Sequence, residues 1–487
     1  MAVKVFNTLT KKKEELVTRD PGKVSMYVCG PTTYNYIHLG NARPLVAFDT
    51  VRRYLKYRGY DVTYVQNFTD VDDKIINRSR EEGESPAALA QKYINAYFED
   101  ADALNVLRAD VHPRVTDHMG EIIQMVQGIM EKGLAYEVGG NVYFDVRKFF
   151  GYGKLSGRDL DEMKAGARVD VGEEKQDPLD FALWKAAKPG EPSWDSPWGQ
   201  GRPGWHIECS AMSLKYLGPG FDIHGGGADL IFPHHENEIA QTEAFSGQQF
   251  VRYWLHNGFI TVNEEKMSKS LGNFFLLRDI LARFSPDVIR FYLLSTHYRS
   301  PLDFDDQKLH VAEKGLERIR TSLRLVEDTL RMCKKSPDQG QAGAAGELQQ
   351  KLDAIKAAFI EAMDDDFNTS LAIAAVFDLS REANSFINDS SFKPGKAAVP
   401  VLEKALGIFH EFHEVLGMIE PNRPAGIQDQ GMDEKLMEII IDIRQEARKK
   451  KDWATADAIR DRLKAAGIIL EDTPHGVRWK KIDGAHE

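Results

Sequence analysis

The sequence predicts an α/β domain built on a parallel sheet, split by an insertion and followed by a helical region. Residues 24–28, VSMYV, form a short apolar run that is typical of a buried strand. Apolar side chains then recur on one helical face between residues 46 and 55, and Gly59 gives the stop signal. A second strand, DVTYV, follows at 61–65. A strand, a helix and a strand in this order form a βαβ unit, which implies parallel pairing.

The composition and the spacing of apolar residues change several times after this unit. Residues 118–200 are rich in turns and charge, which predicts an insertion, and FDIHGGGADLIF and YWLHNGFITV then resemble strands with glycine-rich ends. Beyond residue 310 the apolar residues recur at helical spacing, with Asn368 or Thr369 as an N-cap. Residues 420–431 have the composition of a connector. A basic helix and a hairpin follow it. We therefore expect the segments 1–117, 118–200, 201–310, 311–420 and 432–487.

Composition bounds the class of protein. Hydrophobic residues make up 42% and charged residues 28% of the 487 residues, as in globular proteins. The segment MAVKVFNTLTKKK lacks the apolar run of a signal peptide, and no uncharged run of about 18 apolar residues occurs elsewhere, so we expect a cytoplasmic protein outside the membrane. The net charge of −11 argues against non-specific nucleic-acid binding. Three cysteines, at positions 29, 209 and 333, make no disulfide framework.

Two short segments suit the binding of phosphate. YIHLGNARP, at 36–44, lies where a loop enters a helix, and the free N–H groups of a helix start attract anions. His38 and Asn41 can add donors there, although a histidine beside an ordinary helix cap is the plainer interpretation. EEKMSKSLGN, at 264–273, holds Lys266 and Lys269 in a polar loop, where two lysines can bind a polyphosphate or simply face solvent.

Together these segments match the two signature motifs of class I aminoacyl-tRNA synthetases. The chain resembles the cysteinyl-tRNA synthetase family along nearly its whole length. The resemblance rests on MYVCGPTTYNYIHLGNARP, QNFTDVDDKII, YGKLSGR, PGWHIECSAMS, DIHGGGADLIFPHHENEIAQ, EEKMSKSLGN and DFNTSLAIAAVFDL. It implies an α/β Rossmann-like class I catalytic domain with an insertion, followed by an α-helical bundle and a small, mixed carboxyl-terminal anticodon-binding domain.

The resemblance also implies the reaction and its partners. L-cysteine would attack the α-phosphate of ATP, with Mg²⁺, to give cysteinyl-adenylate, and the cysteinyl group would pass to the 3′ end of tRNA(Cys). We expect a monomer. His38, Asn41, Lys266 and Lys269 would stabilise the negative charge of the transition state. Gly40 and Gly227, with His38 and Lys269, would contact the nucleotide, and Thr69, Trp205 and Asp229 the amino acid, although Asp229 could instead be a loop or cap residue.

A metal site is the third expectation. Zinc favours thiolate, imidazole and carboxylate ligands. His234 and Glu238, four residues apart, share one face of a helix, and the family's zinc ligands carry over onto them and onto Cys29 and Cys209, giving one Zn²⁺ per subunit. His235 and Glu236 would then support the ligands, while His235 could also face ATP. The zincin motif His-Glu-x-x-His is excluded, because the chain has HENEI.

The expected role of the zinc is selection. A shaped pocket separates near-isosteres such as cysteine and serine by only about 10–200-fold. A zinc ion that binds the substrate thiolate would separate them much further.

Two alternative functions remain. One is a ligase that joins cysteine to an amino-sugar inositol, which would lack the last module. The other is an inactive tRNA-binding regulator, which would have lost zinc ligands or loop lysines. In that last module the basic residues and Trp453 would contact tRNA; the basic residues are Arg444, Arg448, Lys449, Lys450 and Lys451. Asp70, Asp72 and Asp73 are expected at a helix start.

Overall fold

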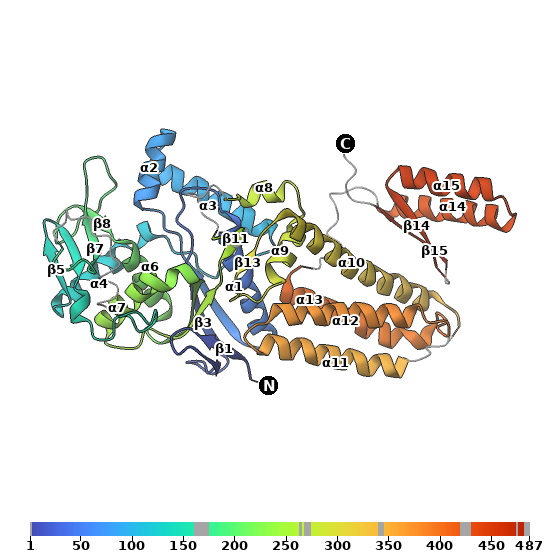
Figure 1. Cartoon of the computed structure of the whole chain (residues 1–487), viewed down its shortest axis with the longest axis horizontal. Helices are drawn as coiled ribbons and strands as arrows, with labels where there is room; N and C mark the ends of the chain where they lie inside the picture. The colour runs from blue at the N-terminus through green and yellow to red at the C-terminus, as the bar shows by residue number, and fades with distance from the viewer. Residues whose placement is uncertain are drawn as a thin grey trace. The chain divides into compact units, whose positions relative to one another are not determined.

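The fold is described from a computed structural model of the whole chain (Figure 1). The structure describes residues 2–159, 175–262, 265–266, 274–338, 345–418, 430–473 and 476–481. The chain divides into two compact units. The first holds 1–387 and 391–419, and the second holds 388–390 and 420–487.

A four-stranded parallel sheet forms the centre of the first unit. Its strands are β3 (Lys23–Val28), β4 (Asp61–Gln66), β9 (Phe221–Gly227) and β10 (Val251–Asn257), in the order β10-β9-β3-β4. All three pairings are parallel, and helix α1 (Leu39–Tyr57) connects β3 to β4, so the predicted βαβ unit is confirmed. Because β3 has β4 on one side and β9 on the other, a crevice is expected between β3 and β9 at their carboxyl ends.

A short antiparallel hairpin precedes the sheet. It consists of β1 (Lys4–Asn7) and β2 (Lys12–Glu15). Asn7 fixes this hairpin to β10, since its side chain accepts a hydrogen bond from Trp254 N–H (3.1 Å) and donates one to Arg252 O (3.0 Å). Four helical elements follow β4: α2 (Asp73–Glu82), α3 (Pro86–Ala103), η1 (Val115–His118) and α4 (Met119–Glu131).

The region between the two halves of the parallel sheet forms an antiparallel sheet of its own. Its strands, in spatial order, are β5 (Ala135–Val138), β6 (Asn141–Phe144), β7 (Phe181–Ala186) and β8 (Gly201–Pro203), with a short turn η2 (Val146–Lys148). The chain then returns through α6 (Trp205–Leu217). After β9 come η3 (Ala228–Leu230), the π turn η4 (Ile231–His235) and α7 (Glu236–Ser246).

The rest of the first unit is mainly helical. A small sheet has the spatial order β12 (Glu265–Lys266), β11 (Ile260–Val262) and β13 (Leu302–Asp303). The helices α8 (Leu277–Leu281) and α9 (Pro286–Leu294) lie between β12 and β13 in the chain. Figure 1 then shows four helices side by side: α10 (Asp306–Lys335), α11 (Ala345–Asp364), α12 (Thr369–Ile387) and α13 (Val399–Leu416), with η6 (Lys396–Ala398) before the last. Asn368 accepts a bond from Leu371 N–H, which confirms the predicted cap.

The second unit is a small α/β module. It contains α14 (Gln430–Lys449), α15 (Trp453–Ala465) and the predicted hairpin, formed by β14 (Ile468–Thr473) and β15 (Gly476–Lys481). The single basic helix of the prediction is two helices, because Lys451 adopts a positive φ of 59° and Asp452 caps α15. Arg444 is buried and pairs with Asp472, so it does not belong to the exposed basic face that we expected. Among the described residues, none of the helices combines the length and the apolar character that crossing a bilayer requires.

Candidate functional site

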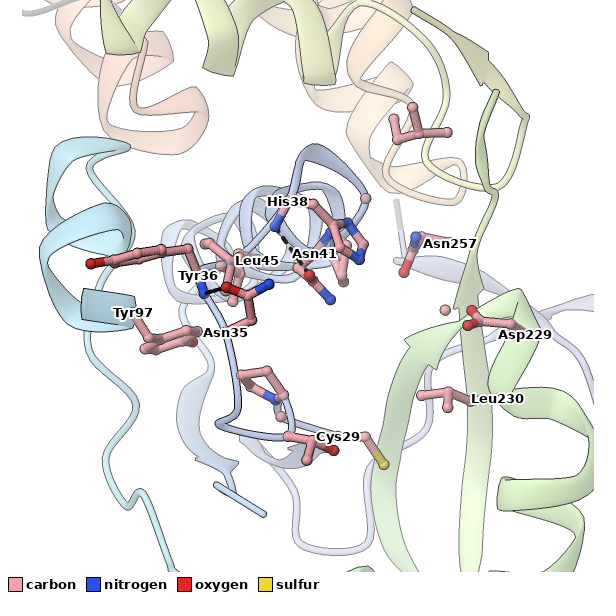
Figure 2. Close-up of a pocket in the computed structure, with 18 of the residues that line it drawn as sticks. Cys29, Asn35, Tyr36, His38, Asn41, Leu45, Tyr97, Asp229, Leu230 and Asn257 are labelled. Atoms are coloured by element: carbon pink, nitrogen blue, oxygen red, sulfur yellow. Dashed lines mark hydrogen bonds between the residues drawn. The ribbon is translucent and has the colours of Figure 1, made fainter. Parts of the chain in front are cut away.

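A cavity of about 330 Å³ lies at the carboxyl ends of the parallel strands (Figure 2). This is the position at which open α/β sheets bind ligands, and the volume suits a small molecule. Figure 2 shows His38 and Asn41 on one wall, Asp229 and Leu230 across from them, and the sulfur of Cys29 at the floor. The predicted site residues that line the cavity are Cys29, His38, Gly40, Asn41, Trp205, Gly227 and Asp229.

The start of α1 forms one wall. His38 is the N-cap, and its Nδ1 accepts from Asn41 N–H (3.2 Å) while Asn41 Oδ1 accepts from His38 N–H (3.2 Å). The two side chains therefore make a reciprocal capping box. Since Nδ1 is an acceptor, a neutral His38 carries its proton on Nε2. The plainer interpretation of these residues, as a helix cap, is thus correct, and the same residues also line the cavity.

The four predicted metal ligands meet below the cavity floor. Cys29 follows β3, Cys209 lies on α6, His234 lies in η4 and Glu238 lies on α7. The Sγ atoms of the cysteines are 3.7 Å apart, Glu238 Oε1 is 3.5 Å from Cys29 Sγ, and His234 Nε2 is 3.0 Å from Glu238 Oε1. All four donor atoms lie within 4.8 Å of one another, so one ion can reach them together.

The charges of this cluster are shifted by its burial and its partners. The hydrogen bond from Cys29 lowers the pKa of Cys209 to about 6, whereas burial raises the pKa of Cys29 well above its ordinary value. Burial acts to raise the pKa of Glu238, but the imidazoles of His224 and His234 outweigh it and lower that pKa to about 2. Burial likewise acts to lower the pKa of His234, and the Glu238 carboxylate outweighs it and raises that pKa to about 10. A cation bound here displaces protons from Cys29 and His234, so its affinity rises with pH.

The donors fit zinc. Two thiolates, an imidazole and a carboxylate are ligands that Zn²⁺ takes in four-coordinate sites. A second group, Cys29, His224, His235 and Glu238, also lies within 4.8 Å and shares two ligands with the first, so the two groups describe one site. The first group offers two soft thiolates where the second offers one, and zinc prefers the softer set.

Three histidines around the cluster were not expected from the sequence: His224 and His256 are buried, and His206 is half-buried. His206 Nδ1 lies 2.9 Å from His234 Nδ1, and His224 Nε2 lies 2.9 Å from Glu238 Oε2, so each orients a ligand. His256, on β10, contacts His235 at 2.8 Å. A lone histidine in an apolar strand gives no local signal, because it is usually a core residue that has a hydrogen-bond partner. The sequence pointed to this region through the four predicted ligands, not through these three histidines.

Glu236 connects α7 to the insertion. Its buried carboxylate accepts hydrogen bonds from Leu155 N–H (3.2 Å) and Ser156 N–H (2.7 Å). The neighbouring Asn237 accepts a hydrogen bond from Tyr152. Glu236 therefore bonds the backbone and holds the GYGKLSGR segment against the ligand-bearing helix.

Replacing Glu236 by glutamine is expected to destabilise the protein by about 1–3 kcal/mol, because one buried N–H loses its acceptor. Thermal unfolding and proteolysis within residues 152–158 would measure the change. Lys154→Ala is the matched control. It removes an ion pair with Glu243 between the same two segments, in which the lysine side chain is 35% exposed, so its cost is at most about 1 kcal/mol. Equal stability of the two variants would contradict the anchoring role.

The remaining predicted residues lie at different depths. The Trp205 ring contacts the His234 ring in a tilted arrangement, with ring centroids 4.4 Å apart, and Trp205 is 40% exposed at the cavity. Thr69 is buried and donates to Glu208 Oε2 (2.9 Å), and it does not line the cavity. Packing explains why Gly225 and Gly226 are glycines. A Cβ added at Gly225 would lie 2.5 Å from the Phe48 ring, and one added at Gly226 would lie 2.8 Å from the His235 ring. Gly227 and Asp229 do line the cavity.

The lysine loop is described only at its ends. Lys269 lies outside the described residues, and of Lys266 only the backbone is described, paired with Thr261 in the β11–β12 ladder. Phe274 lines the cavity, and the next residues join the start of α1: Leu39 N–H donates to Phe275 O (3.2 Å), and Leu277 N–H donates to Ile37 O (3.0 Å). The loop thus begins beside β11, whose Ile260 lines the cavity, and ends beside the start of α1.

The acidic cluster has a structural role. Asp72 is the N-cap of α2 and accepts from Lys74 N–H (2.9 Å), which confirms the helix-start interpretation. Asp73, in the first turn, pairs with Lys185 and Arg202 of the insertion. Asp70 accepts two hydrogen bonds from Thr116. None of the three carboxylates is among the residues that line the cavity.

Comparisons with known proteins agree with this architecture. The family models that match are "tRNA synthetases class I (C) catalytic domain" over residues 15–314, "DALR domain" over 358–420 and "Cysteinyl-tRNA ligase anticodon binding domain" over 438–479. In solved structures, Mycobacterium tuberculosis methionyl-tRNA synthetase in complex with methionyl-adenylate has a TM-score of 0.57 at 16% identity, covering 81% of this chain and 90% of that one. That likeness shows the class I synthetase fold.

Curated relatives show the family. The cysteine–tRNA ligase of Pelotomaculum thermopropionicum is 64% identical over 487 residues, covering 98% of this chain and all of the relative. The cysteine–tRNA ligase of Geobacillus thermodenitrificans is 54% identical over 480 residues, covering 99% of each chain. Because both relatives extend over the catalytic, helical and carboxyl-terminal regions alike, the chain belongs to the cysteine–tRNA ligase family of class I synthetases.

Proposed function

We propose that the chain activates L-cysteine with ATP to cysteinyl-adenylate and pyrophosphate, and then transfers the cysteinyl group to the 3′ end of tRNA(Cys). One observation carries this proposal. The cavity joins a helix start suited to phosphate, at His38 to Asn41, to a mostly buried group of thiol, imidazole and carboxylate donors at its floor. Nucleotide chemistry and thiol recognition are therefore adjacent. The catalyst would act as a monomer.

Different residues around the cavity would bind the nucleotide and the amino acid. The α-phosphate gathers negative charge in the transition state, and donors fixed beforehand stabilise it without reorganising. The start of α1, with His38, Gly40 and Asn41, would serve ATP together with Mg²⁺ and the lysines Lys266 and Lys269. Gly227 would lie against the nucleotide. Asp229, across the cavity in Figure 2, would pair with the substrate ammonium. Trp205 would shape the amino-acid end directly, whereas Thr69, buried outside the cavity and bonded to Glu208, would act there only through its neighbours.

Zinc would be held by Cys29, Cys209, His234 and Glu238. The ion supplies a soft Lewis acid that prefers a thiolate to a hydroxyl, which distinguishes cysteine from serine. The protein's own residues provide the remainder of the selection. The Trp205 ring lies against the His234 ring, and the histidines His206 and His224 fix the orientation of two ligands. A substrate side chain at the cavity floor would therefore meet a site of fixed geometry.

The second unit would bind the anticodon end of tRNA(Cys). Arg448 is half-buried and, like Arg444, pairs with Asp472, so the exposed basic residues are those at the end of α14 and in the turn after it, at 449–451. Trp453, 56% exposed, begins the next helix beside them. Positive charge next to an open aromatic ring suits phosphates and an unstacked base.

The test is cysteine-dependent ATP–pyrophosphate exchange, followed by charging of tRNA(Cys). We expect exchange with L-cysteine, little exchange with L-serine, and loss of the cysteine signal after a strong chelator removes the metal. Zinc added back alone should restore it. Exchange without any charging of tRNA would contradict the proposal and favour a ligase with another acceptor. Exchange that does not depend on cysteine would reject both.

A further inference from the structure

Four polar side chains form a line from the amino-terminal hairpin to the metal ligand Cys29. Thr8 Oγ1 lies 2.8 Å from His256 Nδ1. His256 Nε2 lies 2.8 Å from His235 Nδ1. His235 Nε2 lies 3.4 Å from Cys29 Sγ, within hydrogen-bond range for sulfur. The line crosses β10 and η4 and ends at β3, and both histidines in it are buried.

The backbone holds this line in place. Thr8 N–H donates to Trp254 O (2.9 Å), so the hairpin is fixed to β10 whatever the side chain at position 8. The His235 ring lies against the Cα of Gly226, where an added Cβ would stand 2.8 Å from Cε1. That glycine therefore leaves the space that the imidazole fills. Residues from four separate segments are thus positioned around one path of hydrogen bonds.

The chemistry of the ligand sets the direction of the path. A metal-bound cysteine sulfur has no proton and can only accept, so His235 must present Nε2–H to it. A neutral imidazole has one N–H and one lone pair, and His235 Nδ1 must then accept from His256 Nε2–H. His256 Nδ1 is left as an acceptor. The donor at the end of the path is the hydroxyl of Thr8, which is half-buried at the edge of the site.

We propose that Thr8 is a positioning residue of the metal centre: its hydroxyl ends a hydrogen-bond path that directs the N–H of His235 to the Cys29 sulfur. This inference rests on the metal site of the proposed function. Only the metal-bound state depends on the path. Without metal, the Cys29 thiol can donate instead to Glu238 Oε1 (3.5 Å) or to Cys209 Sγ (3.7 Å).

Thr8→Val tests the role, because it keeps the shape of the side chain and removes only the hydroxyl. Partners that orient metal ligands typically change affinity about 10–100-fold. Since Thr8 acts through two imidazoles, we expect an effect at the lower end of this range. Zinc release to a chelator should be about 10-fold faster than in the wild type. Thr8→Ser restores the donor and should behave as the wild type. Thr10→Val makes the same chemical change two residues away, at an exposed hydroxyl bonded to Asn7 O, and should leave release unchanged.

A spectroscopic readout separates this role from a structural one. In the full chain loaded with Co²⁺, a weaker hydrogen bond leaves the sulfur richer in electrons, so the thiolate-to-cobalt band of Thr8→Val should move to longer wavelength. The band of Thr8→Ser should stay in place. If the valine and serine variants have superimposable bands and equal zinc release, the path is refuted while the metal site stands. If the wild-type chain retains neither ion, the metal site itself is refuted and this inference with it.

Discussion

Cys209→Ser is expected to lose its zinc and to lower cysteine-dependent ATP–pyrophosphate exchange by about 100-fold or more, since loss of an orienting partner alone costs up to about that much. In the folded chain the hydrogen bond from Cys29 lowers the pKa of Cys209 to about 6, so this sulfur is already a thiolate at neutral pH. A serine hydroxyl in the same buried place stays protonated and is a poor zinc ligand. Metal analysis per chain and the exchange rate measure the two effects.

Cys333→Ser is the matched control. This thiol is also buried, on α10 within the helical bundle, and it is not among the metal donors that the described residues offer. The same atomic change there should leave one zinc per chain and an unchanged exchange rate. If Cys209→Ser retained a full equivalent of zinc, the second donor group, with His224 and His235, would hold the metal instead.

Lys269→Ala should lower the rate of adenylate formation by about 100–1,000-fold, the range seen when one donor to a transition-state charge is removed. The affinity for cysteine should stay the same, because the lysine would act on the phosphates of ATP and not on the amino acid. Single-turnover adenylation and equilibrium binding of cysteine separate the two quantities. Equal losses in rate and affinity would contradict a transition-state role.

Lys188→Ala controls for the removal of one positive charge. Lys188 is an exposed residue at a turn of the insertion. Its loss should change neither the rate of adenylate formation nor the affinity for cysteine. Lys269→Arg gives a further comparison: it keeps the charge but replaces a compact ammonium by a planar group, so we expect partial recovery of the rate.

The sheet could be predicted because its signals are local. The apolar runs at 24–28 and 61–65 and the glycine stop after α1 each lie within a few residues, and the structure has β3, α1 and β4 there. The break between α14 and α15 was missed. The sequence KKKDW keeps good helix formers up to the break, and what ends α14 is the positive φ of Lys451 together with the Asp452 cap.

Only the part of the site that lies in local motifs could be predicted from the sequence. A helix start with His38 and the i, i+4 pair of His234 and Glu238 are visible in the sequence. The surroundings are not, because His206, His224 and His256 come from three elements and meet only when the sheet is complete. The capping bonds of His38 likewise depend on side-chain geometry that no spacing encodes.

The strand order has a consequence for the growing chain on the ribosome. Strand β3 pairs with β4 soon after both are made, but its other partner, β9, is synthesised roughly 150 residues later, on the order of ten seconds at usual elongation rates. During that interval one edge of β3 is an open template for strand pairing with other chains. Cys29, at the end of the same strand, lacks its three co-ligands until Cys209, His234 and Glu238 have been synthesised. Slow translation before β9 would therefore favour aggregation, and all four metal ligands are available only once α7 has been made.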